Sequence, residues 1–350
     1  MKIFHIVWGL EVGGIETMLV NIANGQAHLG HIVSVMVIND MECHQIADSF
    51  DSAVKIIRLH RRPGSKNPWP IARLNLLLWH HKPDVIHFHA LNMPRLVAKR
   101  FRRHSITTLH TICHPEDLRY VSQSSHIAAI SREVADDLRR RSGASATVVL
   151  NGINSANIML RDTDKPLGEP MRIVQVGRLN HKVKGQDLMI ECMALLAKRG
   201  INVELDLIGD GPSREALCSL AARLGITDKV HLLGAMTQDE IFRRLRDYDL
   251  LVQPSRIEGF GLTVAEAMAA QLPVAVSNLR ALVEVIDNGS CGYIFKNNDA
   301  ASIAECIADI AGAGIDAEKV SAARRRAIRL YSIDATVSGY LSLYSQILSK

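Results

Sequence analysis

The stretch that decides the fold is "LLVQPSRIEGFGLTVAEAMAAQLPVAVS", residues 250–277. It opens with the apolar run Leu250–Ser255 and closes with the apolar run Pro273–Ser277, and each has the length of a buried strand. Between them, a loop that contains glycines leads into a helix expected to begin near Thr263. A strand, a helix and a second strand in this order predict a β-α-β unit with parallel strands.

The same alternation of short apolar runs and amphipathic segments extends over most of the chain. In the first half, the candidate strands are Lys2–Trp8, Ile32–Ile38, Val85–Ala90, Ile106–Thr111, His126–Ser131 and Thr147–Gly152. In the second half, they are Arg172–Gly177, Val203–Gly209, Val230–Gly234 and the two runs above. Segments of helical period, such as Glu16–His28 and Ile71–His81, separate several of them. We therefore predict an α/β fold with two Rossmann-like domains, each a doubly wound parallel sheet, facing a cleft.

A polar segment with proline and glycine, "DTDKPLGEPM" (Asp162–Met171), interrupts this pattern and is the expected linker. We place the N-terminal domain at residues 1–165 and the C-terminal domain at residues 166–334. Residues 335–350 carry apolar side chains at helical spacing. We expect this last helix to pack back across the domains.

The composition is typical of a globular protein, with 47% hydrophobic and 22% charged residues in a chain of 350. No run approaches the roughly 20 apolar residues that a membrane-spanning helix requires. The N-terminus, "MKIFHIVWGL", is expected to form the first strand rather than a signal peptide, because no small-residue cleavage site follows it. The six cysteines form no CxxC pair, which favours free thiols in a reducing cytoplasm.

Positive charge is concentrated in the first half of the chain. Residues 1–165 contain 20 Lys and Arg against 14 Asp and Glu, a net charge of +6, whereas the remaining residues have a net charge of −1. Two basic clusters stand out, one at Arg100, Arg102 and Arg103 and one at Arg139, Arg140 and Arg141. They are either solvated helix ends or a surface for anionic lipid or a phosphorylated acceptor. No nucleic-acid partner is expected, because aromatic residues are only 5% of the chain and do not interleave with the clusters.

Two carboxylates flank the Gly-Phe-Gly loop of the opening stretch. Glu266 has two interpretations: it completes a capping box with Thr263, or it contacts a ligand. Glu258 precedes the helix and lies beside Gly259, so capping does not explain it. A carboxylate in such a loop is suited to accept hydrogen bonds from adjacent sugar hydroxyls.

Other strand exits carry groups suited to phosphate. Gly13 and Gly14 follow the first strand and open the first helix, although the dinucleotide fingerprint GxGxxG is absent. Arg178, Lys182 and Lys184 follow the strand Arg172–Gly177, and cations there suit a diphosphate. "IGDGP" (Ile208–Pro212), which contains Gly209, is a similar strand exit. Each of these signals is also explained by an ordinary turn or a solvated loop.

Four histidines are candidates for one site in the first half. His87 and His89 lie on one face of a strand, and His110 and His114 follow downstream. Zinc requires several ligands converging in a defined geometry, and this spacing does not enforce one. We expect no metal and instead predict that His89 and His110 are polar groups lining the ligand cleft.

Taken together, the motifs resemble those of the retaining glycosyltransferases of family 4, which have the GT-B fold, of the type that builds bacterial surface polysaccharide and lipopolysaccharide. The resemblance rests on "VGGIET", "KPDVIHFH", "TLHT", "VVLNGIN", "VGRLNHKVKG", "LIGDGP", "VHLLG" and the E-x7-E pair of Glu258 and Glu266. Each motif alone is weak. Their common order and spacing across most of the chain make the resemblance specific.

The resemblance implies roles for the matching residues. Glu258 would hold the hydroxyls of the donor sugar, Glu266 the ribose diol, and Arg178 and Lys184 the diphosphate. The implied donor-binding set is Gly13, Gly14, Arg178, Lys184, Gly209, Glu258, Gly259, Phe260, Gly261, Leu262 and Glu266. His110 and Glu258 would be the catalytic residues, with His89 and His110 on the acceptor side. The N-terminal domain would then serve the acceptor and the C-terminal domain the donor.

The implied reaction transfers a sugar from a UDP- or GDP-linked donor to a hydroxyl of a glycan or glycolipid, with retention of configuration and without a metal or other cofactor. The expected location is the cytoplasm, at the inner face of its membrane, with the basic N-terminal domain touching anionic lipid. Two alternatives are a nonhydrolysing nucleotide-sugar epimerase and a catalytically inactive protein that binds nucleotide sugar. The E-x7-E pair argues against the epimerase.

One departure from the family pattern predicts local strain. Gln271 occupies the position where such proteins usually end the helix with glycine. A left-handed backbone there would cost about 1 kcal/mol relative to glycine.

Overall fold

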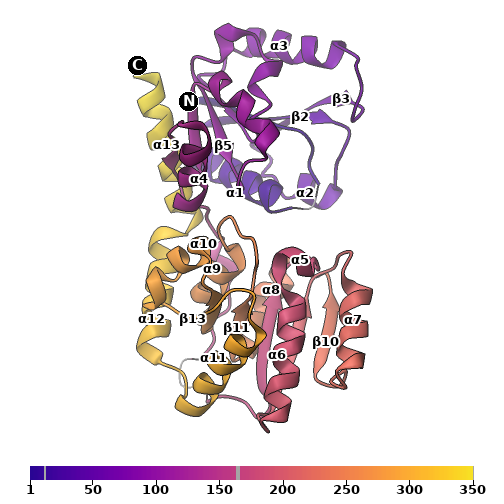
Figure 1. The fold of residues 1–350 in the computed structure, drawn as a ribbon. Coiled ribbons are helices and arrows are strands. Elements are labelled where there is room, and N and C mark those ends of the chain that lie inside the picture. Colours follow the sequence, from indigo (N-terminus) through magenta and orange to yellow (C-terminus); the bar gives the residue numbers. More distant parts are fainter. Residues whose placement is uncertain (12, 163–165, 350) are drawn as a thin grey trace. The chain divides into compact units, whose positions relative to one another are not determined.

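The computed structural model describes residues 1–11, 13–162 and 166–349 of the chain. They form two compact units, the first comprising Met1–Gly152 with Ser332–Lys350 and the second Ile153–Tyr331. Each unit is a parallel β-sheet covered by helices (Figure 1). Of the expected linker, residues 163–165 lie outside the described part of the chain.

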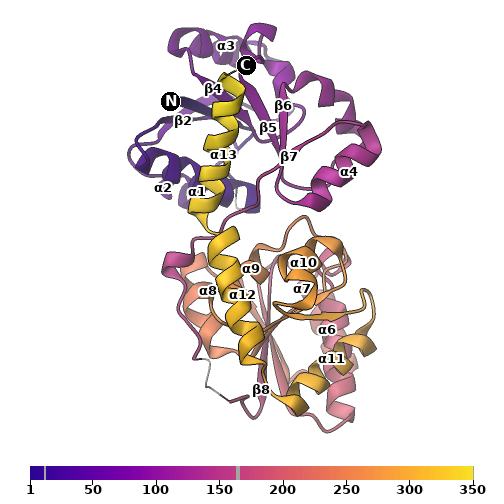
Figure 2. The ribbon, with the colours of Figure 1, turned by 90° about the vertical axis from the view of Figure 1, so that its left-hand side faces the viewer.

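The sheet of the N-terminal unit has seven parallel strands in the order β3-β2-β1-β4-β5-β6-β7 (Figure 2). Its strands are β1 (Lys2–Val7), β2 (Ile32–Asn39), β3 (Lys55–Arg61), β4 (Val85–Phe88), β5 (Ser105–Leu109), β6 (His126–Ala129) and β7 (Thr147–Val148). The order reverses between β1 and β4, because the chain first winds outward through β2 and then returns to the other side of β1. Such a switch point leaves a crevice at the carboxyl ends of the two strands, where open α/β sheets bind ligands.

Both faces of this sheet are covered. The helices are α1 (Gly14–His28), α2 (His44–Asp48), α3 (Trp69–His81), α4 (Arg132–Ser142) and α13 (Ile333–Leu348). Because side chains alternate along a strand, Phe4 and Ile6 of β1 pack in one core with α3, whereas Val7 packs in another core with α1. The last helix, α13, packs against α1 in this unit: a Cβ on Gly25 would meet the side chain of Val337 at 2.7 Å.

The sheet of the C-terminal unit has six parallel strands in the order β10-β9-β8-β11-β12-β13. They are β8 (Met171–Val176), β9 (Val203–Ile208), β10 (Val230–Gly234), β11 (Leu250–Gln253), β12 (Val274–Ser277) and β13 (Tyr293–Phe295). The helices are α5 (His181–Lys184), α6 (Gln186–Lys198), α7 (Arg214–Arg223), α8 (Gln238–Arg244), α9 (Leu262–Ala269), α10 (Arg280–Val285), α11 (Ala300–Ala313) and α12 (Ala317–Leu330). The switch point falls between β8 and β11, so the exits of these two strands are the expected ligand site.

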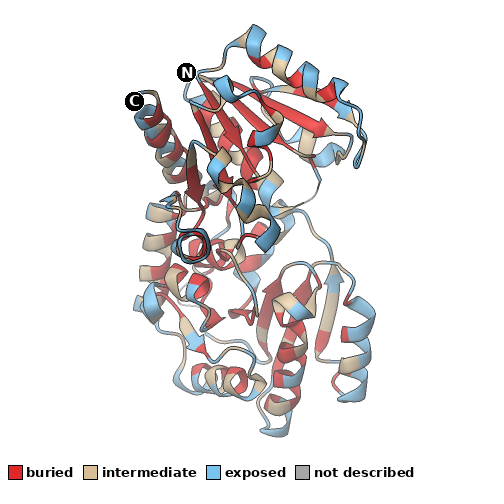
Figure 3. Ribbon diagram, turned by 45° about the horizontal axis from the view of Figure 1, so that its top comes forward, coloured by how far each residue is buried: buried red, intermediate tan, exposed pale blue. Residues whose placement is uncertain are grey.

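The two parallel, doubly wound sheets confirm the predicted fold class. Buried residues concentrate in the strands, and exposed residues lie on the outer helices (Figure 3). Two strands were not predicted, β3 and β13; each lies at one edge of its sheet, as do the predicted strands β7 and β10, and β13 has only three residues. Edge strands are paired on one side only, so their sequences are more polar; β3 reads "KIIRLHR". Among the described helices, none is both long and apolar enough to cross a bilayer.

Gln271 follows the end of α9 and has the left-handed backbone that the sequence analysis predicted, with φ of 60°. The amide of Gln271 donates to the carbonyl of Met268 at 3.2 Å, and the amide of Leu272 donates to the carbonyl of Ala267 at 3.0 Å. These two bonds form a Schellman motif, which ordinarily places glycine at this position. The loop that leads into β12 is therefore fixed by hydrogen bonds at the cost of a strained residue.

Replacing Gln271 with glycine should therefore stabilise the protein. We expect Gln271→Gly to raise the free energy of unfolding in urea by about 0.5–1 kcal/mol, because glycine adopts the left-handed region freely. Gln271→Ala is the matched control and should change stability little, since alanine keeps the backbone strain. Destabilisation by Gln271→Gly would contradict this account of the helix end.

Candidate active site

The loops that leave β8 and β11 are bound to each other. The amides of Arg256 and Ile257 both donate to the carbonyl of Val183, at 2.8 and 3.2 Å. Gly185 presses against the end of β11, where an added Cβ would lie 2.2 Å from the carbonyl oxygen of Pro254. Glycine is required at Gly185 for this reason and for its φ of 69°. Side chains from the two strand exits are thereby brought together at the switch point.

Arg256 reinforces this junction. Its guanidinium forms a bidentate pair with Asp187 of α6, with N···O distances of 2.6 and 3.0 Å, and also donates to the carbonyl of His181 at 2.6 Å. Planar bidentate pairing of this kind fixes orientation as well as distance. No role was predicted for Arg256, although this residue lies just before Glu258 in the sequence.

Lys184 and Glu258 meet at this junction. The Nζ of Lys184 lies 2.7 Å from Oε2 of Glu258, and the two side chains are 25% and 14% exposed. The hydroxyl of Ser255 donates to the same oxygen at 3.3 Å, and the amide of Gly259 donates to Oε1 at 3.3 Å. The residue assigned to the diphosphate and the residue assigned to the sugar are thus direct neighbours, each neutralising the other.

Two strand exits of this unit, those of β8 and β9, carry Arg178 and Gly209, which were assigned to the donor. Arg178 follows β8 and is exposed, and among the described residues no hydrogen bond or ion pair engages its guanidinium. Gly209 follows β9 with φ of 142°, and a Cβ there would lie 2.1 Å from the carbonyl oxygen of Gly177. The backbones of these two exits therefore touch, which only glycine permits.

The amino end of α9 follows the loop that leaves β11. Gly261 caps the helix with φ of 107°, and a Cβ there would lie 2.6 Å from the side chain of Leu282. Within the described residues, no acceptor is found for the amides of Gly261 and Leu262. The ring of Phe260 is buried and packs edge-on against Tyr331, with ring centroids 5.3 Å apart, so it anchors the turn. Unpaired amides at a helix amino terminus attract anions.

The capping interpretation of Glu266 is wrong. Helix α9 begins at Leu262 and has no side-chain cap, so Thr263 and Glu266 form no capping box. Glu266 is instead 7% exposed and accepts a hydrogen bond from the amide nitrogen of Gln238 at 3.0 Å. Burial raises the pKa of Glu266 to about 7, because desolvation disfavours the charged carboxylate and the bond from Gln238 only partly opposes this.

Glu266 should therefore reduce stability at neutral pH. In the folded state, the carboxyl of Glu266 stays protonated up to about pH 7, whereas in the unfolded chain it loses its proton above the ordinary pKa of 4.5. The contribution of Glu266 to the free energy of unfolding therefore falls as the pH rises from 4.5 to about 7, by at most about 3 kcal/mol. We expect Glu266→Gln to be more stable than the wild type in urea at pH 8, with the difference shrinking towards pH 5. A difference independent of pH would contradict the raised pKa.

In the N-terminal unit, Gly13 and Gly14 lie where β1 leads into α1, as predicted. Gly13 is the N-cap and has an extended backbone, with φ of −168°. A Cβ on Gly13 would lie 2.6 Å from Oε2 of Glu16, so the carboxylate of Glu16 lies over this turn. Desolvation raises the pKa of Glu16. A phosphate approaching this turn would have to displace the Glu16 side chain or form a hydrogen bond with its protonated carboxyl group.

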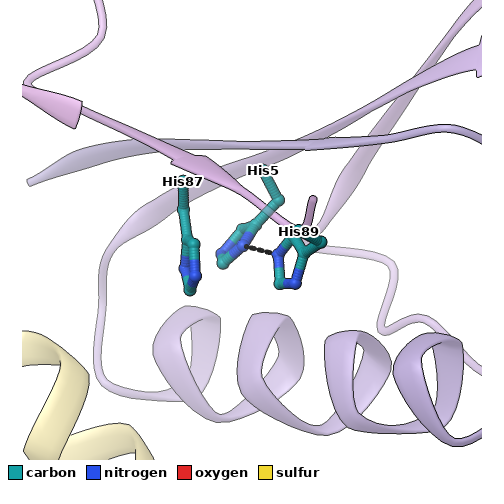
Figure 4. Close-up of side chains that lie close together, drawn as sticks. All are labelled: His5, His87 and His89. Carbon is teal, nitrogen blue, oxygen red and sulfur yellow. Dashed lines mark hydrogen bonds between the residues drawn. The ribbon is translucent and has the colours of Figure 1, made fainter. Parts of the chain in front are cut away.

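The predicted histidines form part of a buried hydrogen-bond chain. Nδ1 of His5 lies 3.0 Å from Nε2 of His89, and Nδ1 of His89 lies 3.0 Å from Nε2 of His110. At the inner end, Nε2 of His5 lies 2.9 Å from the amide oxygen of Gln26 on α1. Figure 4 shows the contact between His5 and His89, with His87 beside them. The sequence analysis identified His89 and His110 but missed His5 and Gln26.

Burial keeps these rings neutral. Desolvation lowers the pKa of His5 and of His110 to about 4, and it lowers the pKa of His89 well below its ordinary value. A neutral imidazole has one N–H donor and one acceptor nitrogen. The direction of every hydrogen bond between these histidines is therefore fixed by the group that the last ring contacts.

Gln26 sets that pattern. Its amide oxygen only accepts, so His5 donates from Nε2, His89 donates from Nε2 to His5, and His110 donates from Nε2 to His89. The amide nitrogen of Gln26 donates to the hydroxyl of Tyr344 on α13 at 3.3 Å, which holds the amide in this orientation. Nδ1 of His110, for which no partner is found among the described residues, then presents a lone pair.

His87 belongs to a second arm of the same network. Its Nδ1 lies 2.6 Å from the hydroxyl of Tyr344 and its Nε2 lies 2.7 Å from the hydroxyl of Thr108. Nitrogens of His5, His87 and His89 lie within 4.8 Å of one another, close enough to hold a metal ion. Both ring nitrogens of each histidine already take part in hydrogen bonds, however, so a metal would have to break that network. The geometry favours a hydrogen-bonded polar core over a metal site.

The tautomers can be read directly by NMR. At neutral pH, the imidazole ¹⁵N shifts of His5, His89 and His110 should all report the Nε2–H form, and they should not titrate near pH 6.5. Gln26→Leu removes the terminal acceptor and should leave a mixture of tautomers. An Nδ1–H form of His110 in the wild type would contradict the donor pattern, because it requires the Gln26 amide to be reversed.

Comparisons with known proteins agree with this fold. A sequence model described as Glycosyltransferase Family 4 matches residues 12–157, and one described as Glycosyl transferases group 1 matches residues 161–327. The chain is 24% identical to a glycogen synthase of Mycobacterium tuberculosis, over 93% of this chain and 88% of the relative. It is 26% identical to a phosphatidyl-myo-inositol mannosyltransferase of Mycobacterium leprae, over 75% and 74%.

The solved structures support the same conclusion about the architecture. The crystal structure of Anabaena HepE in complex with UDP and glucose superposes with a TM-score of 0.82 at 19% identity, covering 99% of each chain. The two sequence models together span nearly the whole chain. The chain belongs to the family 4 glycosyltransferases, with the GT-B fold, and is a glycosyltransferase.

Proposed function

We propose that this glycosyltransferase moves a hexose from a UDP- or GDP-linked donor to a hydroxyl acceptor, with retention of configuration. The observation that carries the proposal is the Lys184–Glu258 ion pair at the β8 and β11 exits, 2.7 Å long and partly open to solvent. A donor separates the two side chains: the diphosphate takes Lys184, and the sugar hydroxyls take Glu258. Lys184 then exchanges the carboxylate for another anion, and Glu258 exchanges the ammonium for neutral hydroxyl donors, so both side chains keep hydrogen-bond partners.

The diphosphate is held by the protein's own donors. Arg178 and Lys184 supply charge, and the amides of Gly261 and Leu262 supply hydrogen bonds at the positive end of α9. These groups stabilise the charge that develops on the leaving phosphate, so the step needs no metal ion. Glu266, which lies one turn into α9, accepts hydrogen bonds from the ribose diol. The complexes of similar proteins with UDP support a nucleotide-linked donor.

The reaction follows from these contacts. A bond forms between the acceptor oxygen and the anomeric carbon, while the bond from that carbon to the β-phosphate oxygen breaks. Attack on the face that the leaving group vacates retains the configuration. The proton of the acceptor hydroxyl passes to the departing phosphate, so no protein base is required. His110 accepts a hydrogen bond from a sugar hydroxyl through its Nδ1 lone pair, which positions the sugar.

We further propose that the acceptor is a glycolipid or a growing cell-surface glycan. Similarity to a phosphatidyl-myo-inositol mannosyltransferase supports an acceptor of the lipid-linked class. An acceptor of this kind places the work in the cytoplasm, at the inner face of the membrane. The net positive charge of residues 1–165 suits that location, because the cytoplasmic leaflet is anionic.

Glu258→Gln tests the central role. It keeps the shape of the side chain but removes its charge, so transfer should fall by at least about a hundredfold. Because Lys184 loses its competing partner, the affinity for the nucleoside diphosphate alone should be unchanged or higher. Transfer is measured with radiolabelled donor, and affinity by calorimetry. Near-normal transfer by this variant would contradict the assignment.

A matched pair of lysine variants separates specific binding from general charge. Lys184→Met should weaken nucleoside diphosphate binding by about tenfold or more, because it removes a charge-assisted bond. Lys182→Met, two residues away and exposed, should not. Equal losses in both variants would indicate only a diffuse electrostatic attraction.

A further inference from the structure

Helix α3 carries an apolar outer face that nothing in its unit covers. Trp69, Leu76 and Trp79 are 76%, 62% and 54% exposed. They are spaced by seven and three residues, which places them on one side of a helix. The opposite side of α3, with Leu74 and Leu78, is buried in the core. Two of the three tryptophans in the chain are therefore displayed side by side with a leucine.

This face lies within the most basic part of the sequence. Residues 52–103 contain twelve Lys and Arg and a single acidic residue, Asp84. Many of these cations are exposed: Lys55, Arg62, Lys66, Arg73, Lys82, Lys99, Arg100 and Arg103. The single carboxylate of Asp84, which accepts a hydrogen bond from the backbone amide of Lys2 at 2.7 Å, offsets only one of these cations.

Three of these cations are held on or beside α3, which carries the apolar face. Arg73 is on α3 itself, and Lys82 caps its carboxyl end. The side chain of Asn75 donates to the carbonyl of Leu96 at 2.9 Å and accepts from the amide of Ala98 at 2.8 Å. These two bonds hold the segment that continues into Lys99 alongside α3.

We propose that this surface, the outer face of α3 with its flanking cations, docks on an anionic lipid bilayer. Tryptophan is favoured at the membrane interface because its ring is apolar and its indole N–H is polar. A helix that lies in the interface plane inserts its apolar residues among the acyl chains while nearby Lys and Arg meet the headgroup phosphates. Nucleic acid fits less well, because a protruding leucine between two tryptophans has no counterpart on a phosphate backbone.

A membrane docked on α3 would not contact the side of the sheet that carries the histidine chain. In β1, Phe4 and Ile6 face α3, so His5 faces the other side of the sheet, where Gln26 and α1 lie. The lipid surface and the polar network are therefore on opposite faces of the same sheet. The membrane contact holds the enzyme at the bilayer without blocking that network.

The test uses the full chain and no sugar substrate, so its outcome does not depend on the proposed reaction. The chain is sedimented with vesicles of phosphatidylcholine alone and with vesicles in which a quarter of the lipid is phosphatidylglycerol. We expect binding to the anionic vesicles, with a blue shift of tryptophan emission. Trp8 contributes little to the shift, because it is half-buried and donates to Asn92.

Variants identify the surface. The double variant Trp69→Ser/Trp79→Ser and the single variant Leu76→Ser should each bind the anionic vesicles at least about fivefold more weakly, with unchanged circular dichroism, since these side chains lie outside the core. Arg73→Glu should weaken binding to anionic vesicles and make the remaining binding less dependent on salt concentration. Leu29→Ser is the matched control, because Leu29 is 60% exposed on the same unit but outside α3.

The inference is overturned if anionic vesicles do not bind the wild type, or if the α3 variants bind as well as the wild type. It is also overturned if Leu29→Ser loses as much binding as Leu76→Ser, which would indicate a non-specific apolar effect. Competition by duplex DNA with loss of the emission shift in the same variants would assign the face to nucleic acid instead.

Discussion

The ion pair between Lys184 and Glu258 is the interaction on which the candidate site depends. It exists because the β8 and β11 loops are bound together by backbone hydrogen bonds to Val183 and by the contact of Gly185 with Pro254. Without a ligand, the ion pair gives each of these two partly buried charges an oppositely charged partner. The same geometry makes both groups available to a ligand that carries negative charge and hydroxyls on adjacent atoms. Preorganisation of this kind lowers the cost of binding, since no loop has to be ordered first.

The N-terminal unit uses polarity where the C-terminal unit uses charge. Its buried histidines are kept neutral by desolvation. Gln26, at the inner end of the hydrogen-bonded row of histidines, decides which nitrogen of each ring carries the proton. In the proposed function, the lone pair at Nδ1 of His110 accepts a hydrogen bond from a hydroxyl, and the neutral ring adds no charge. Because α13 contributes Tyr344 to this network, the last helix of the chain completes the polar core of the first unit.

Local patterns predicted the sheets because parallel strands are short, apolar and buried on both faces. The same reasoning missed β3, whose edge position allows polar residues, and β13, whose three residues are too few to show a pattern. At the site, sequence motifs identified Lys184 and Glu258 separately, yet their contact depends on how two loops 74 residues apart are held. Glu266 satisfied the spacing of a capping box, but α9 starts one residue earlier and buries the carboxylate against Gln238. His5 and Gln26 carry no motif, because their role arises only from contacts across the fold.

In the proposed function, the C-terminal unit holds a nucleotide sugar with its own cations and amides. Calorimetric titration of the protein with UDP- and GDP-linked hexoses, in buffer containing EDTA, tests it most directly. We expect one of these donors to bind at a single site per chain, with an affinity that added Mg²⁺ does not change. Binding that requires the metal, or no binding of any nucleotide sugar, would contradict it.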